Sequence, residues 1–379
     1  MSRPLEGIRI IEVGHMLAGP YCGLLLADLG AEVIKIEPAE GDIARKISPY
    51  QVGGYNAYFA SLNRNKKSVV LDLACEAGQA ALADIAKSAH ALVTNLRPSA
   101  IKKLGLTYES LKRFNERLVC VALTGYGLDG PYAERPAYDY VVQAMTGVMA
   151  LTGDPDAPPT KAGYSAVDNS AGIMAAVGLL AKIVQGKGGQ VDVAMYDVML
   201  SQLNYLAGAA LNAGERQERL ANSSHPYIVP AQIFRASDGW LTLFITHDKF
   251  WQKFCKELGK PAWLEDPRYA TMAGRRDNRR LVVDDIAKVL SSAPAGQWVR
   301  RLAPLGVVVA EVGTLNDALE NELTAYREMV VQLGDGSLPL RAVGNPIKLD
   351  DAETEYGLPP LLDQHRSEIL GAPSEPKSA

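Results

Sequence analysis

The sequence has 379 residues, enough for more than one hydrophobic core, so its length favours two domains. Its formal net charge is only -4 at pH 7, which gives no reason to expect nucleic acid or an anionic membrane as a partner. Its four cysteines form no C-x-x-C pair and its five histidines show no H-E-x-x-H spacing, so we expect a reduced, cytoplasmic protein without a metal site.

The chain begins without the apolar stretch of a signal peptide, and no segment approaches 18 uninterrupted apolar residues, so we expect neither secretion nor a membrane span. Its first 123 residues alternate strands with helices. β-Branched runs predict strands at 8–13, 31–37, 68–73, 91–96 and 118–123, and apolar periodicity predicts helices at 20–29, 76–88 and 100–114. This alternation predicts an α/β fold whose parallel sheet carries helices on both faces.

The loops that follow the strands are the candidate binding segments, because ligands of such sheets bind beyond the carboxyl ends of the strands. These loops cover residues 14–20, 74–78, 95–99 and 124–131. The first reads G-H-M-L-A-G-P and lacks G-x-G-x-x-G, so a nicotinamide cofactor is only weakly indicated. A tight strand-to-helix turn is the simpler interpretation.

The stretch 161–180 contains one carboxylate, Asp168, followed by small and apolar residues. The small residues let another backbone approach, and the apolar ones predict a buried helix. One interpretation makes Asp168 the N-cap of this helix, with Asn169 or Ser170 sharing that role, because Asp, Asn and Ser favour the position. The other makes Asp168 a nucleophile. On this segment alone the cap is the commoner role.

The second half of the chain changes in character after residue 224. The pattern first predicts a turn at 185–190, a strand at 191–194, a long apolar helix at 195–213 and a polar linker at 214–224. Strands at 232–234 and 241–245 then flank a hairpin turn at 237–239, and amphipathic helices follow. We therefore expect a large domain over 1–215, a small α+β domain over 225–330, and a C-terminal segment, 331–379, that returns to the large domain.

Several motifs, in their order and spacing, resemble one family over nearly the whole chain. They are G-H-M-L-A-G-P at 14–20, A-D-L-G-A-E-V-I-K-I-E at 27–37, N-R-N-K-K-S-V-V-L-D-L at 63–73, T-N-L-R-P at 94–98, G-Y-G-L-D-G-P-Y at 125–132, R-P-A-Y-D at 135–139, the Asp168 segment, and H-P-Y-I-V-P at 225–230. The sequence thereby resembles the class III coenzyme A transferases, of the formyl-CoA transferase-like or CaiB-BaiF type. That group also contains the 2-methylacyl-CoA racemases.

The resemblance implies a large Rossmann-like domain, a small domain between its two halves, and an interlocked homodimer. It implies that Asp168 is the catalytic aspartate and that the turn at Leu17 and Ala18 faces the reacting carbonyl. The nucleotide and pantetheine of coenzyme A are then expected at Leu71, Asp72, Leu73, Ala74, Asn95, Leu96, Arg97, Lys103, Thr124, Gly125, Tyr126 and Gly127. No tightly bound cofactor is implied, because coenzyme A enters as acyl-CoA and a small carboxylic acid is the second substrate.

The expected reaction moves coenzyme A from an acyl-CoA thioester to a free acid through an aspartyl anhydride and an aspartyl-CoA thioester. A desolvated carboxylate suits the attack, and main-chain amides suit the tetrahedral intermediates. Two alternatives stay open, a 2-methylacyl-CoA racemase and a noncatalytic CoA-binding protein. The racemases carry a histidine in the motif that here reads R-P-A-Y-D, and Tyr138, which takes its place, is a poor base at neutral pH.

The sequence departs from the family's pattern at three places. Ala74 stands where lysine is common, residues 222–224 read Asn-Ser-Ser where glycines are common, and Val308 and Glu311 stand where prolines are common. A phosphate or ribose contact is expected to differ at the first place. The flexible loop that covers the aspartyl intermediate in some members is in doubt at the second, and acid specificity is expected to differ at the third.

Overall fold

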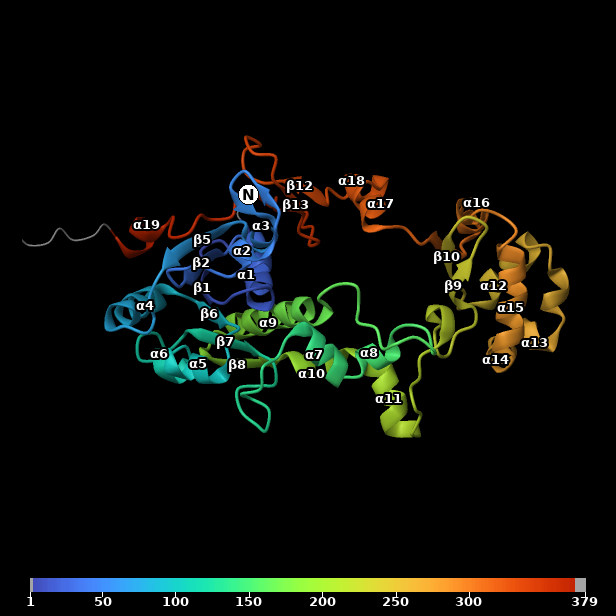
Figure 1. Cartoon of the computed structure of the whole chain (residues 1–379), viewed down its shortest axis with the longest axis horizontal. Coiled ribbons are helices and arrows are strands. Elements are labelled where there is room, and N and C mark those ends of the chain that lie inside the picture. Colours follow the sequence, from blue (N-terminus) through green and yellow to red (C-terminus); the bar gives the residue numbers. More distant parts are fainter. Residues whose placement is uncertain (1–2, 372–379) are drawn as a thin grey trace, which may run out of the picture. The chain divides into compact units, whose positions relative to one another are not determined.

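The computed structural model describes residues 3–371 (Figure 1). The described chain forms two compact units, each built from separate stretches of sequence. The first unit contains residues 3–146, 163–208 and 321–371, and the second contains residues 147–162 and 209–320. The expected boundaries at 215 and 330 compare with 208 and 320 in the structure, whereas no sequence pattern indicates the passage of 147–162 through the second unit.

A six-stranded parallel sheet forms the centre of the first unit. Its strands are β1 (Arg9–Val13), β2 (Glu32–Glu37), β5 (Lys66–Val70), β6 (Ala91–Thr94), β7 (Val119–Thr124) and β8 (Gly189–Ala194). They lie in the order β5-β2-β1-β6-β7-β8, and every neighbouring pair is parallel. The predicted α/β architecture is confirmed. The strand order reverses between β1 and β6, the position at which ligands bind in doubly wound sheets.

Helices cover both faces of this sheet (Figure 1). Consecutive residues of β1, β2 and β7, which point to opposite faces, are therefore buried alike. On one face, α4 (Glu76–Ser88), α5 (Pro98–Lys103) and α6 (Tyr108–Leu111) pack against Ile11, Ile34 and Leu92. On the other face lie α1 (Ala18–Asp28) and α9 (Ala166–Gln185). The shorter elements of this unit are α2 (Ala44–Ile47), β3 (Gln51–Val52), β4 (Tyr55–Asn56), α3 (Ala57–Asn63), α7 (Asp139–Met145) and α10 (Met195–Gln202), and α11 (Asn204–Ala213) runs from this unit into the second.

Most predicted elements differ from those observed by one or two residues at an end, and three differ more. The strand predicted at 68–73 is β5, Lys66–Val70. It begins with two lysines, a residue that is disfavoured in strands, and Lys66 Nζ lies 2.7 Å from Glu12 Oε2 inside the unit. The helix predicted at 100–114 is interrupted at Gly105, whose φ of 67° ends α5 before α6 begins. The helix predicted at 195–213 breaks at Leu203 into α10 and α11.

The second unit has a hydrophobic core of its own, centred on buried Trp251, Phe254 and Trp298. Strands β9 (Ala231–Arg235), β10 (Trp240–Phe244) and β11 (Val308–Glu311) form its antiparallel sheet, and β9 and β10 make the predicted hairpin. Its helices are α8 (Val148–Leu151), α12 (Asp248–Glu257), α13 (Pro267–Ala270), α14 (Met272–Asp277), α15 (Arg279–Leu290), α16 (Ala295–Leu302) and α17 (Leu315–Leu319), with 3-10 helices at Ala221–Ser223, Pro261–Leu264 and Ala303–Leu305.

Two departures from the family's pattern lie in this second unit. Asn222 and Ser223 have φ values of 56° and 54°, in the left-handed region that glycine adopts most easily. The chain therefore keeps a glycine-like backbone there without the freedom of glycine. Val308 and Glu311 begin and end β11, and both side chains are exposed.

The C-terminal segment packs against the first unit. The stretch that returns to this unit begins at Asn321, before the expected 331, and contains α18 (Glu322–Tyr326), β12 (Val330–Gln332), β13 (Arg341–Val343) and α19 (Arg366–Leu370). The amide of His365 donates to the Ser68 carbonyl at 3.0 Å, and the Val70 amide donates to Asp363 Oδ1 at 2.7 Å. These bonds close the free edge of β5, which would otherwise offer unpaired main-chain groups to another strand.

Candidate active site

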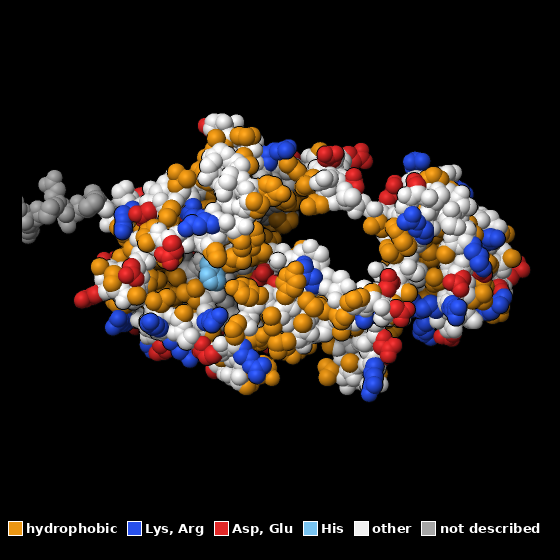
Figure 2. All heavy atoms as spheres, viewed as in Figure 1, with side chains coloured by type: hydrophobic (Ala, Val, Ile, Leu, Met, Phe, Trp, Pro, Cys, Tyr) orange, Lys and Arg blue, Asp and Glu red, His pale blue; other side chains and the backbone are white. Residues whose placement is uncertain are grey.

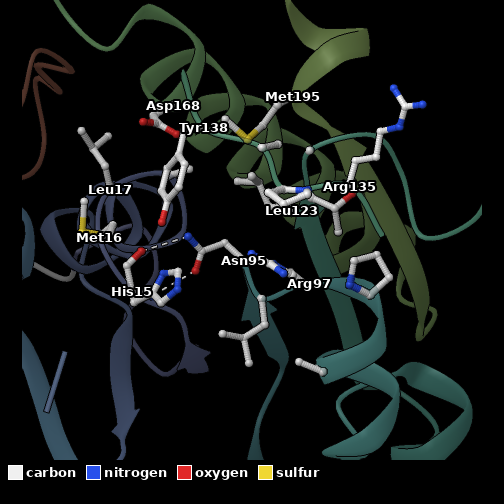
Figure 3. Close-up of a pocket in the computed structure, with 18 of the residues that line it drawn as sticks. His15, Met16, Leu17, Asn95, Arg97, Leu123, Arg135, Tyr138, Asp168 and Met195 are labelled. Atoms are coloured by element: carbon white, nitrogen blue, oxygen red, sulfur yellow. Dashed lines mark hydrogen bonds between the residues drawn. The ribbon is translucent and has the colours of Figure 1, made fainter. Parts of the chain in front are cut away.

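A cavity of about 320 Å³ opens at the carboxyl ends of β1, β6 and β7, where the strand order reverses. It lies within the first unit. Its lining comes from the turn after β1, the loops after β6 and β7, and the N-terminal part of α9 (Figure 3). The residues are His15, Met16, Leu17, Ala18, Tyr58, Asn95, Leu96, Arg97, Pro98, Ser99, Ala100, Leu123, Thr124, Gly125, Ala133, Arg135, Pro136, Ala137, Tyr138, Asp168 and Met195. This is the position that the α/β pattern predicts for a ligand.

Asp168 is the third residue of α9 and its side chain forms no cap. The N-cap position belongs to Ser165, whose side chain makes no capping hydrogen bond. Asp139, at the start of α7, supplies the acceptor instead: its Oδ1 accepts the Val167 amide at 2.8 Å and the Asp168 amide at 3.4 Å. The interpretation of Asp168 as an N-cap is therefore wrong, and its carboxylate is left for another role.

The Asp168 carboxylate is mostly buried yet receives no hydrogen bond and forms no ion pair within residues 3–371. Burial, followed by the negative charge of Asp139, raises the pKa of Asp168 to about 7. By contrast, Asp139 is hydrogen-bonded, because Oδ2 accepts from Gln143 Nε2 at 2.5 Å in addition to the amides at Oδ1. Of the two neighbouring acids, Asp168 is the one with free oxygens and raised basicity.

A glycine brings α9 and α1 close together. A Cβ atom at Gly172 would lie 2.8 Å from the Ala18 carbonyl oxygen and 3.3 Å from the Cys22 amide nitrogen, so glycine alone fits this contact. The contact places the first turn of α9 next to the N-terminus of α1. The small residues after Asp168 thus do what the sequence predicts for them: they let a second backbone approach.

The turn between β1 and α1 presents main-chain amides at the cavity. Asn95 holds the turn from the next strand, since its Oδ1 accepts the His15 amide at 3.0 Å and its Nδ2 donates to the His15 carbonyl at 2.9 Å (Figure 3). The amides of Leu17 and Ala18 have no acceptor in the described part of the chain. Free amides at a helix N-terminus can stabilise an oxyanion.

The structure brings some of the sequence-predicted residues together with Asp168 and leaves others apart. Those that line the cavity are Leu17, Ala18, Asn95, Leu96, Arg97, Thr124 and Gly125. Those that do not line it are Leu71, Asp72, Leu73, Ala74, Lys103, Tyr126 and Gly127.

The residues outside the cavity lie in three places. The side chains of Leu71 and Leu73 belong to the core beside α4, whereas Asp72 and Ala74 are exposed in the turn that enters that helix. Lys103 is exposed at the end of α5. Tyr126 and Gly127 follow the lining residue Gly125 directly, and the Tyr126 ring packs edge-on against Tyr132 at 5.9 Å between centroids. Residues 71–74 and 126–127 follow the carboxyl ends of β5 and β7, the same end of the sheet at which the cavity opens.

Other lining residues were not predicted for the site. Figure 3 shows the ring of Tyr138 between Asp168 and the turn at His15 and Met16. The sequence drew attention to Tyr138 only as a replacement for histidine. Tyr58 lies in the same cavity, and burial, followed by the charges of Asp168 and Asp42, raises its pKa. No sequence signal marks Tyr58, which stands in an ordinary helical segment.

Comparisons with known proteins match nearly the whole chain. Residues 5–366 fit the sequence pattern of CoA-transferase family III. The chain is 35% identical over 370 residues to an acetyl-CoA:oxalate CoA-transferase of Acetobacter aceti, which covers 95% of this chain and 94% of that relative. It is 33% identical over 386 residues to a succinate–glutarate CoA-transferase of Agrobacterium fabrum, which covers 97% and 95%. The crystal structure of a CAIB/BAIF family protein from Brucella suis is similar, with a TM-score of 0.85, 32% identity, and coverage of 97% of this chain and 100% of that one.

Proposed function

Because the chain belongs to CoA-transferase family III and is an acyl-CoA:carboxylate CoA-transferase, we propose that Asp168 carries the reaction through covalent intermediates. The observation behind the proposal is a mostly buried carboxylate that lies in the cavity without a hydrogen-bond donor and has a raised pKa. A carboxylate that is neither solvated nor paired keeps its basicity, which favours nucleophilic attack.

The first half of the reaction makes an aspartyl thioester. A carboxylate oxygen of Asp168 attacks the carbonyl carbon of the acyl-CoA, and the carbon–sulfur bond breaks. CoA departs as thiolate, and Asp168 and the acyl group are joined in a mixed anhydride. The thiolate then attacks the carbonyl carbon of Asp168. The first acid leaves as a carboxylate, and the enzyme holds CoA as aspartyl-CoA.

The second half reverses these steps with the acceptor. The acceptor carboxylate attacks the aspartyl carbonyl and expels CoA thiolate, which forms a second mixed anhydride. The thiolate attacks the acyl carbon of the acceptor, giving the product thioester and the free carboxylate of Asp168. Water takes no part, so the free energy of the thioester is conserved, and the Leu17 and Ala18 amides stabilise the tetrahedral oxyanions.

The substrates are proposed from the relatives and from the predicted residues. We assign coenzyme A to the residues that the family resemblance implies at the carboxyl ends of β5, β6 and β7. They are 71–74, 95–97, Lys103 and 124–127. The relatives are named for oxalate, succinate and glutarate, so we assign short dicarboxylic acids to the acid site. No tightly bound cofactor is proposed. Four free cysteines accord with a cytoplasmic enzyme.

The protein is proposed to be an interlocked homodimer. Ile173, Met174 and Val177 of α9 are about half exposed, at 45%, 44% and 53%. Figure 2 shows hydrophobic side chains gathered over the surface around α7 and α9. In the described chain α9 is also the one helix that is long and apolar enough to cross a membrane. Buried core helices of soluble proteins have the same length and composition. A second subunit covering this face explains the exposed apolar surface.

Mass photometry tests the dimer. We expect a particle of twice the mass of the 40.8 kDa chain even at nanomolar concentration, since interlocked chains separate only after partial unfolding. A monomer at that concentration which regains activity at once on concentration would contradict the interlocked arrangement.

The test of the activity is incubation of the pure protein with pairs of acyl-CoAs and free acids, with mass spectrometry of the thioesters formed. We expect exchange of coenzyme A between short dicarboxylic acids. The same panel in heavy water tests the racemase alternative, which needs two acid/base groups beside the thioester. Deuterium entering the α-carbon of 2-methylacyl-CoA at a useful rate, without CoA exchange, would overturn the proposed role of Asp168 in favour of proton transfer, as in a racemase. If coenzyme A binds and neither reaction occurs, the proposed role of Asp168 is overturned as well, in favour of noncatalytic CoA binding.

A further inference from the structure

A group of charged side chains lies beside the cavity without lining it. Glu12 of β1, Lys35 of β2, Lys66 of β5 and Asp42 of the loop after β2 have no exposed side-chain surface. These four side chains form the ionic cluster. Register brings the first two together, because Glu12 pairs with Lys35 across β1 and β2. The cluster therefore lies on the face of the sheet that α1 covers.

Lys35 and Asp42 hold the first half of the turn that follows β1. Lys35 Nζ donates to Glu12 Oε1 at 2.8 Å and to the Gly14 carbonyl at 3.0 Å, and it forms an ion pair with Asp42 Oδ2 at 2.9 Å. Asp42 Oδ1 accepts the Met16 amide at 3.2 Å. Burial alone would lower the pKa of Lys35, but the charges of Glu12 and Asp42 outweigh it and raise that pKa. Lys35 therefore remains a cation.

Lys66 holds the first turn of α1, which follows the same turn directly. Its Nζ donates to Glu12 Oε2 at 2.7 Å, to the Pro20 carbonyl at 2.8 Å and to Asn63 Oδ1 at 3.0 Å. Its three N–H groups thus have three acceptors. Together with Lys35 and Asp42, Lys66 ties the cluster to main-chain groups on both sides of Leu17 and Ala18.

These contacts fix which amides of the turn are free. Met16 has a φ of 62°, which is costly for a residue with a side chain, and its amide is used by Asp42. The next two amides, of Leu17 and Ala18, have no acceptor among residues 3–371. An oxyanion donor is effective only when it is already aimed at the position where the charge will develop.

We propose that the ionic cluster is a positioning device for CoA transfer, which holds the Leu17 and Ala18 amides toward the carbonyl that Asp168 attacks. This inference rests on the proposed function. Stability alone does not require the cluster, because apolar residues of similar volume often replace buried ion pairs without loss. Apolar side chains, however, leave the Gly14 carbonyl and the Met16 amide without partners. The cluster's specific contribution is therefore to the turn.

The test compares two buried ion pairs of the first unit. In the Asp42→Asn variant, the amide group either presents a donor to Lys35, which breaks the ion pair that fixes residue 42, or presents a donor to Met16, which breaks the hydrogen bond to the turn. Either orientation loosens the hold of residue 42 on the turn. The control is Asp28→Asn. Asp28 is buried and pairs with Arg64 at 2.6 and 2.9 Å, but it contacts no residue of the turn. Both variants leave a buried cation with a weakened partner.

For Asp42→Asn we expect kcat to fall about 100-fold, the range for a lost or misaligned oxyanion donor, with KM for acyl-CoA changed less than about threefold. Hydrogen exchange at the Met16 amide is expected to become faster by about tenfold or more. Asp28→Asn is expected to lose stability while its folded fraction keeps kcat within about threefold and Met16 exchange unchanged.

The outcomes separate the possible roles. If both variants lose kcat only in proportion to their unfolded fraction, or if Asp42→Asn leaves Met16 exchange unchanged, the positioning role is overturned. If Asp42→Asn does not fold, exchange in the wild-type protein decides: a slow Met16 amide beside fast Leu17 and Ala18 amides supports the proposal, and equal rates overturn it. If the wild type transfers no CoA while Met16 exchange responds to Asp42→Asn, the proposed function fails and the cluster still holds the turn.

Discussion

Two groups of carboxylates lie at the same cavity, one beside it and one with Asp168 in its lining, and they differ in the partners of their charges. In the ionic cluster, Glu12 and Asp42 meet two ammonium groups. Burial would raise the pKa of each acid, but its partners together outweigh burial and lower both values: Lys35 and Lys66 for Glu12, and Lys35 with the Ala44 and Met16 amides for Asp42. Asp139 and Asp168 form no ion pair within the described residues 3–371, and burial together with the charge of Asp139 raises the pKa of Asp168 to about 7.

The difference distinguishes carboxylates with a structural role from the carboxylate that can react. A carboxylate that meets ammonium groups and main-chain amides is fixed in place and loses basicity, so it suits a structural task. An acid without donors keeps its lone pairs available, and its charge raises the free energy of the folded protein. The cavity therefore has one side that is held by paired charges and one side that carries an unpaired carboxylate.

The largest effect is expected from neutralising the unpaired carboxylate. Asp168→Asn should lower kcat by about four orders of magnitude or more, because the amide is too poor a nucleophile to form the anhydride. Acyl-CoA binding, measured by calorimetry, should be nearly unchanged. The matched control is Asp197→Asn, which alters an exposed acid at the corresponding third position of α10 and should preserve kcat.

The same variant should gain stability at alkaline pH. The folded-state pKa of Asp168 is about 7, above the ordinary value of 3.8, so the wild type loses stability as pH rises between these values. At pH 8 we expect Asp168→Asn to be more stable by on the order of 2 kcal/mol, after allowance for partial exposure. Denaturant unfolding at pH 4 and pH 8 measures this difference. An equal stability difference between variant and wild type at pH 4 and pH 8 would show that ionisation of Asp168 does not destabilise the folded protein.

A smaller loss is expected from disturbing the paired side. A Cβ atom at Gly23 in α1 would lie 2.0 Å from Glu12 Oε2, so Gly23→Ala must displace that carboxylate from the ionic cluster. We expect a net destabilisation of about 1–3 kcal/mol, despite the better helix propensity of alanine. We also expect kcat of the folded variant to fall by about tenfold, measured well below its unfolding temperature. Unchanged kcat in a destabilised variant would assign Glu12 a purely structural role.

The smallest effect concerns the pH dependence of the unpaired side. In the wild type, kcat/KM should fall about tenfold per pH unit below about pH 7, as the Asp168 carboxylate of the free enzyme becomes protonated. Asp139→Asn removes the neighbouring charge but keeps an oxygen for the Val167 amide. The midpoint should therefore move down by roughly half a unit to one unit. A midpoint that moves up, or stays fixed, would contradict the proposed coupling of the two acids.

Much of the fold follows from local patterns in the sequence. The alternation of β-branched and helical segments predicts the parallel sheet, and the S-D-G turn at 237–239 predicts the β9–β10 hairpin. The start of β5 is missed because Lys66 reads as a surface residue, and its partner Glu12 is 54 positions away. Charged residues inside otherwise apolar strands, as in V-I-K-I at 33–36, are the local signal that such a cluster exists. Their pairing depends on strand register, which the sequence pattern alone does not specify.

The candidate site is predictable in part for the same reason. Asp168, the turn at Leu17 and Ala18, and Asn95 stand in motifs and meet at the cavity. The role of Asp139 as the acceptor for α9 depends on a contact between helices that are separated in sequence, so Asp168 is mistaken for the cap when its segment is taken alone. Tyr58 enters the cavity from α3 without any motif of its own.

Covalent trapping at Asp168 tests the central claim most directly. Hydroxylamine or borohydride added during turnover with an acyl-CoA donor, followed by digestion and mass spectrometry, should give a hydroxamate or a reduced aspartyl product on the peptide that contains Asp168. The peptide that contains Asp139 should remain unmodified. An unlabelled Asp168 peptide, together with an Asp168→Asn variant that exchanges CoA at the wild-type rate, would contradict the nucleophilic role.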